Sequence, residues 1–152
     1  MVLVEKLKFL GQGTQKLVYE HPDDPQKVIK IMKPENATID GGRANQHHLR
    51  SHRSQGIYRH FRRELLQYLQ LCKNNYKDNN FTFPIETVHG FIATNKGLGL
   101  VTEKITSPNG NSLTLEHLLI NGDFSTKQKE ALNTFFNECC RYHVAFGEVK
   151  IG

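Results

Sequence analysis

Two glycines, a lysine and a glutamate have the types and spacing of a phosphate-binding site. Gly11 and Gly13 lie in the run Leu-Gly-Gln-Gly-Thr, and residues without a Cβ let backbone amides approach phosphate oxygens. Lys30 follows in the apolar run Val-Ile-Lys-Ile-Met, and Glu64 in Arg-Arg-Glu-Leu. Each residue also has a simpler interpretation when it is taken alone: a plain hairpin, a snorkelling surface lysine and a solvated helix face.

The hydrophobic pattern predicts a sheet that would carry the glycines and the lysine. Short β-prone runs are separated by Gly, Pro and Asp turn residues, so the first three runs form an antiparallel meander. Two later runs are divided by a turn that begins at Asn95. The five expected strands are 7–10, 16–19, 27–32, 83–92 and 97–105. Because side chains alternate along a strand, Lys30 shares a face with Val28, and Ile29 and Ile31 point the other way.

A helix is expected after residues 34–55, which show no hydrophobic period and are predicted to be a loop. Phe61, Leu65 and Cys72 recur at helical spacing, with Tyr68 or Leu69 between them, and would form the apolar side.

Two helices are predicted beyond the last strand. Ser112 would cap a short helix to Leu119, and Ser125 a longer one to about Ala145. The apolar side of the longer helix would consist of Leu132, Phe135, Phe136 and Cys139.

In this order, on this pattern of strands and helices, the candidate residues resemble the small lobe of a protein kinase. In that family a glycine-rich loop covers the ATP phosphates, a lysine on the third strand holds them, and a glutamate from the first helix orients the lysine. The resemblance assigns these roles to Gly11 and Gly13, to Lys30 and to Glu64. Lys16 departs from the pattern because it occupies the position of the third loop glycine.

The adenine end of the site is also implied by this resemblance. Val18 corresponds to the valine that packs over the adenine ring. Thr102-Glu103-Lys104-Ile105 corresponds to the hinge, where the backbone groups of Glu103 and Ile105 would meet the adenine edge. The implied cofactor is therefore ATP.

A closer similarity is to the YrbL-like family, kinase-related bacterial proteins named for the PhoP regulatory network. It rests on Tyr-x-His-Pro-x-Asp from Tyr19 to Asp24, on the Lys30 strand and on Arg-Arg-Glu-Leu around Glu64. It implies an α+β fold, in which a kinase-like small lobe (a five-stranded antiparallel sheet plus one helix) precedes the first helices of the large lobe. Residues 1–105 would form the small lobe, with a basic insert at about 34–59, and 106–152 would begin the large lobe.

The catalytic segment of a kinase is only partly matched. Lys150 aligns with the catalytic-loop lysine, and Glu148 stands where the family has its catalytic aspartate. The sequence contains no Asp-Phe-Gly, so Mg²⁺ is expected only with a further segment. We expect these 152 residues not to transfer phosphate by themselves, as a truncated product or with the missing lobe supplied elsewhere, and the question of enzymatic activity stays open. The expected partners are an adenine nucleotide and a protein substrate or regulator.

Charge and composition bound the alternatives. The net charge is +5, and residues 41–63 contain six arginines, four histidines and no acid, so the rest of the chain is nearly neutral. This basic segment could serve an adaptor that binds nucleic acid or another anionic partner, but it lacks interleaved aromatics, and a solvated insert is the simpler interpretation. A metal site from His47, His48 and His52 is disfavoured, because no Cys or acid accompanies them.

The compartment is predicted from the absence of targeting signals. No signal-peptide pattern or membrane-length apolar run occurs, and the three cysteines do not make a disulfide framework. We therefore expect a cytoplasmic protein with no membrane or nucleic-acid partner.

One expectation can be tested by geometry alone. If the kinase resemblance is real, the Lys30 ammonium should lie within about 4 Å of the Glu64 carboxylate, or face it across a cleft. A Glu64 that points to solvent, away from Lys30, would refute the ATP site.

Overall fold

The computed structural model describes residues 1–44, 55–107, 115–122 and 124–144. Its contacts divide the chain into two compact units, which we describe separately. The first comprises residues 1–80 and 86–104, and the second comprises residues 81–85 and 105–152.

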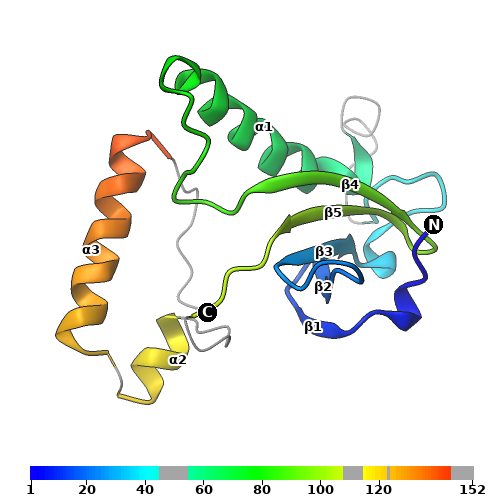
Figure 1. Cartoon of the computed structure of the whole chain (residues 1–152). Coiled ribbons are helices and arrows are strands. Elements are labelled where there is room, and N and C mark those ends of the chain that lie inside the picture. Colours follow the sequence, from blue (N-terminus) through cyan, green and yellow to red (C-terminus); the bar gives the residue numbers. More distant parts are fainter. Residues whose placement is uncertain (45–54, 108–114, 123, 145–152) are drawn as a thin grey trace. The chain divides into compact units, whose positions relative to one another are not determined.

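The first unit is built on a five-stranded antiparallel sheet with the strand order β1-β2-β3-β5-β4 (Figure 1). The strands are β1 (Phe9–Gln12), β2 (Lys16–Glu20), β3 (Lys27–Met32), β4 (Val88–Thr94) and β5 (Gly97–Glu103). Helix α1 (Arg59–Asn74) follows β3 in the chain, and short 3-10 turns occupy Val4–Lys6, Pro34–Asn36, Gly56–Tyr58 and Tyr76–Asp78. This arrangement confirms the predicted α+β fold, with the sheet and helix of a kinase-like small lobe.

Two strand starts differ from the sequence expectation. The first strand begins at Phe9 rather than Leu7, because Val4–Lys6 forms a helical turn that continues into Leu7. The fourth strand begins at Val88 rather than Phe83. The reason is pairing: β4 and β5 form a hairpin, and the register from Thr94 opposite Gly97 reaches Thr102 of β5 at Val88.

The two faces of the sheet bury different clusters. Ile29, Ile31 and Val101 pack with Val4 of the N-terminal segment on one face. Met32 and Leu100 pack on the other face with Ile57 and with Phe61 of α1. Lys30 and Met32 are two residues apart on β3 and therefore share the face that α1 covers, as the alternation predicts.

Helix α1 is amphipathic, although its apolar side differs in detail from the prediction. Phe61 and Leu71 are buried. Tyr68 is half-buried whereas Leu69 is half exposed, so Tyr68 is the residue on the apolar side. Leu71 is buried at three residues from Tyr68, where the predicted periodicity instead used Cys72 at four, and Cys72 is only half-buried.

Residues 34–44, which were predicted to be a loop, contain regular backbone hydrogen bonds. After the turn at Pro34–Asn36, Ala37 pairs with Arg43, and the Ala44 amide donates to the Asn36 carbonyl at 2.9 Å. The carbonyl of Gly41 accepts from the Ile57 amide at 3.0 Å, which links this turn to the start of α1. Backbone hydrogen bonds hold this turn, and the hydrophobic pattern of the sequence does not predict such bonds.

The second unit contains α2 (Leu115–Ile120) and α3 (Thr126–Arg141). The predicted cap at Ser125 is confirmed, since its amide donates to the side chain of Gln128 at 3.1 Å. The helix ends at Arg141, before the predicted Ala145, and His143 then takes a positive φ. On the predicted apolar side Cys139 is buried and Leu132 half-buried, whereas Phe135 and Phe136 are exposed. Ser112, the expected cap of the short helix, lies outside the described residues.

Candidate functional site

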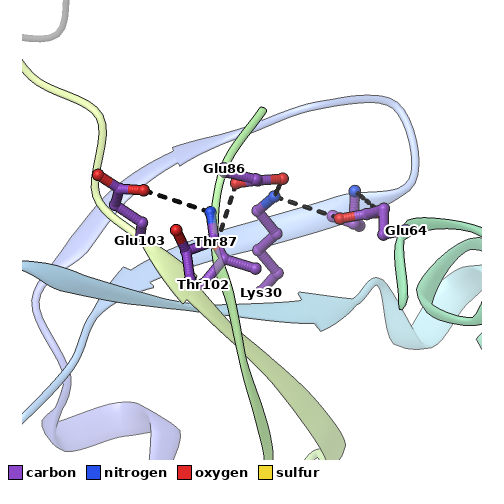
Figure 2. Close-up of polar contacts among 7 residues, drawn as sticks. Lys30, Glu64, Glu86, Thr87, Thr102 and Glu103 are labelled. Atoms are coloured by element: carbon purple, nitrogen blue, oxygen red, sulfur yellow. Dashed lines mark hydrogen bonds and ion pairs between the residues drawn. The ribbon is translucent and has the colours of Figure 1, made fainter. Parts of the chain in front are cut away.

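The structure brings Lys30 of β3 and Glu64 of α1 together on one face of the sheet. The Lys30 Nζ lies 3.3 Å from Glu64 Oε2, which confirms the predicted distance (Figure 2). The Lys30 side chain is only 12% exposed and that of Glu64 23%. Lys30 is therefore not a snorkelling surface lysine, and Glu64 does not belong to a solvated helix face.

A second carboxylate, which the sequence did not indicate, also contacts Lys30. Glu86 precedes β4, and its Oε1 forms an ion pair with the Lys30 ammonium (Figure 2). Its other oxygen, Oε2, accepts a hydrogen bond from the Thr102 hydroxyl at 3.0 Å, and Thr102 is fully buried. Only the β4–β5 register, which places this stretch beside Thr102, could have revealed Glu86.

Lys16 is a further member of the cluster. Its ammonium lies 2.5 Å from Glu64 Oε1, so the two oxygens of this carboxylate serve two different lysines. In the kinase resemblance Lys16 is only a departure from the glycine pattern. A signal was present in the strand alternation, because Lys16 shares its face of β2 with Val18, which pairs with Lys30.

The cluster holds Glu64 in its ionised form. Burial alone would raise the pKa of the Glu64 carboxyl, but Lys30 and Lys16 outweigh this effect and lower the pKa below its ordinary value. With Glu86 included, two ammonium groups face two carboxylates, and the formal charges balance. Each ammonium has three donors, so the two carboxylates leave Lys30 one donor that no residue in the described part of the chain occupies.

The two glycines lie in and beside the first strand. Gly11 pairs with Val18, and the amide of Gly13 donates to the Lys16 carbonyl at 2.9 Å. A Cβ built on either glycine would meet nothing within 4 Å, and neither has a left-handed φ. Among the described residues, neither packing nor backbone conformation therefore requires a glycine at these positions.

The residues that the resemblance assigns to the adenine end lie on different parts of the fold. Val18 is opposite Lys30 in the β2–β3 register and shares its face. The Glu103 amide donates to the Thr87 carbonyl at 2.9 Å, so this amide is not free to meet an adenine edge. Ile105 is exposed and belongs to the second unit.

Other predicted residues lie outside the described part of the chain. These are the candidate catalytic residues Glu148 and Lys150, and the disfavoured metal ligands His47, His48 and His52. Where the structure is described, no group of three His, Cys, Asp or Glu side chains could hold a metal ion. Within the same residues, no helix combines the length and the apolar character that crossing a bilayer requires.

The fold and the cluster define an α+β protein with a lysine–carboxylate site on one face of an antiparallel sheet. A family model described as PhoP regulatory network protein YrbL matches residues 2–152, and the chain belongs to this family. The similarity to the YrbL-like family drawn from the sequence is thereby confirmed. Among curated proteins, none matches the chain.

Proposed function

We propose that this chain is a kinase-like regulatory protein that binds an adenine nucleotide at the Lys30 cluster. The observation that carries the proposal is the 3.3 Å pair between Lys30 and Glu64, formed by residues 34 positions apart on a strand and a helix. In the proposed complex, Lys30 binds the phosphates, Gly11 and Gly13 lie above them, and Val18 contacts the adenine.

The energetics of the pair favour a binding role over a stabilising one. Taking two charges out of water costs several kcal/mol per ion, and a buried pair often only breaks even against apolar residues. Lys30 lies between Ile29 and Ile31, which are buried on the opposite face, and an apolar residue in its place would simply extend the core. An ordered ammonium with a donor that no described residue occupies is useful where an anion must be bound.

The open space at the two glycines supports the same location. No described atom lies within 4 Å of a Cβ at Gly11 or Gly13, so another molecule can approach the backbone there. The proposal concerns nucleotide binding. In the kinase resemblance the metal ligands belong to an Asp-Phe-Gly segment, which these residues do not contain, and bound Mg²⁺ would supply phosphate charge neutralisation.

A protein substrate or regulator is the proposed partner of the nucleotide-bound form, and the cytoplasm is its proposed location. The location is supported by the cysteines, since Cys72, Cys139 and Cys140 are all free thiols. Free thiols are typical of reducing compartments.

The test is isothermal titration of ATP into the wild type and into Lys30→Met. We expect a micromolar or weaker dissociation constant for the wild type, and a loss of about tenfold or more in the variant. Lys96→Met is the matched control, because it removes the same charge from another ion-paired lysine, which bonds Glu5 at 3.3 Å. Absence of binding at millimolar ATP, or equal losses in both variants, would refute the proposal.

A further inference from the structure

Glu86 has no role in the site implied by the kinase resemblance, although it contacts the same ammonium as Glu64. The two carboxylates approach Lys30 from different elements. Glu64 belongs to α1, whereas Glu86 lies two residues before β4 and accepts a hydrogen bond from Thr102 of β5 (Figure 2).

The backbone that carries Glu86 is fixed by the end of β5. The neighbouring Thr87 donates its amide to Glu103 Oε2 at 3.3 Å, and its carbonyl accepts from the Glu103 amide at 2.9 Å. The side chain is fixed as well, because the buried Thr102 hydroxyl donates to Glu86 Oε2 at 3.0 Å. The remaining oxygen, Oε1, is thereby aimed at Lys30.

The α1 side is held differently. Glu64 shares its carboxylate between Lys30 and Lys16, at 3.3 Å and 2.5 Å. A shift of α1 would therefore weaken the Glu64 contact to Lys30, while the Glu86 contact depends only on the sheet. Lys30 has two anchors, of which only one moves with the helix.

We propose that Glu86 is a positioning residue that anchors Lys30 from the sheet, so that the lysine stays directed into the site when α1 moves. This inference rests on the proposed nucleotide site for its functional meaning. Whether Glu86 holds the Lys30 side chain in place is a separate question, which can be measured without nucleotide.

The first experiment is a double-mutant cycle on ATP affinity with Glu64→Gln, Glu86→Gln and the combined variant. Each single change leaves one anchor, so each should weaken binding by less than about threefold, whereas the combined variant should lose about tenfold or more. Additive losses, or tighter binding by Glu86→Gln, would overturn the inference. Tighter binding would mean that Glu86 competes with the phosphates.

Thr102 supplies a matched pair of variants that leaves both carboxylates in place. Thr102→Val removes the hydroxyl that orients Glu86 with little change in volume, whereas Thr102→Ser keeps it. In the Glu64→Gln background, Thr102→Val should weaken ATP binding about threefold or more relative to Thr102→Ser. Equal affinities would overturn the role of this second anchor, and melting temperatures would identify any variant that fails to fold.

The second experiment measures acylation of the Lys30 amine by an N-hydroxysuccinimide ester, followed by mass spectrometry of the peptide without nucleotide. Loss of both carboxylates should raise the acylation rate more than the product of the two single effects, because either carboxylate alone still holds the amine in a hydrogen bond that the reagent must displace. If acylation follows this pattern but the wild type binds no ATP, the proposed function fails and the Glu86 inference stands. If ATP binds and Glu86→Gln does not raise the acylation rate in the Glu64→Gln background, the inference fails alone.

Discussion

At the residue scale, Lys30 shows what is required to keep a cation on an apolar strand. Its strand neighbours Ile29 and Ile31 are buried on the opposite face, and its own face carries the buried Val28 and Met32. An unpaired ammonium in such a position would be costly. The cost is offset here by two carboxylates, each of which has a further partner.

His60 provides a residue-scale test of the electrostatics beside this cluster. Burial lowers the pKa of the His60 imidazole, and the nearby Arg43, Lys16 and Arg63 lower it further, although Glu64 acts in the opposite direction. The folded pKa is therefore below the unfolded value of about 6.5. The unfolded chain binds more protons in the window below about pH 6.5, so this residue makes the protein less stable as pH falls through that window.

We expect His60→Gln to flatten this part of the pH profile. The measurement is the free energy of unfolding in urea between pH 7.5 and 5 for both proteins. The quantity compared is the difference between them, which cancels the contributions of the other histidines. A difference that does not change with pH, or a wild type that gains stability on acidification relative to the variant, would contradict the prediction.

The site was only partly predictable from its residues. Lys30 and Glu64 could be paired because their order and elements resemble those of a kinase small lobe. Glu86 could not, since a single acid between Ile85 and Thr87 has no distinguishing pattern. Its partner Thr102 is 16 positions away, and only the strand register brings the two together.

At the element scale, a glycine is needed for different physical reasons in the β1–β2 hairpin and in the turn before α1. Gly56 has a φ of +52°, and a Cβ there would lie 2.1 Å from the Gly41 carbonyl oxygen. Neither condition holds at Gly13, where the space is open. Conformation and contact therefore require Gly56, whereas the proposed phosphate approach is what requires Gly13.

The two glycines should respond oppositely to replacement by alanine. Gly56→Ala should destabilise the protein by about 2 kcal/mol or more, through left-handed strain and a backbone clash. Gly13→Ala should leave stability within about 1 kcal/mol and weaken ATP binding. Urea unfolding and titration calorimetry give the two quantities, and a Gly13→Ala protein with unchanged ATP affinity would remove the glycine from the site.

Element types were predicted more successfully than element boundaries. The strands and helices follow from apolar periodicity and turn residues, which are local signals. The start of β4 depends on how far β5 extends, and β5 is a partner that begins nine residues later. The order in residues 34–44 comes from backbone hydrogen bonds such as Ala44 to Asn36, which no side-chain pattern announces.

At the scale of the whole molecule, the described contacts gather in two units, and the Lys30 cluster belongs entirely to the first. Lys16, Lys30, Glu64, Glu86 and Thr102 all lie within residues 1–80 and 86–104. Helix α3 belongs to the second unit. A ligand that binds the cluster should therefore stabilise the first unit directly.

Hydrogen exchange with and without ATP tests this expectation. A ligand that binds only the folded state stabilises it by RT ln(1 + [L]/Kd), or about 2.7 kcal/mol at 100 times Kd. We expect slower exchange in β2, β3 and α1, the elements that carry Lys16, Lys30 and Glu64, and unchanged exchange in α3. In the Lys30→Met protein, exchange in β2, β3 and α1 should not become slower at the same ATP concentration. Protection that appeared first in α3, or that survived Lys30→Met, would place the nucleotide elsewhere, because a phosphate contact at Lys30 cannot act through a residue that has lost its charge.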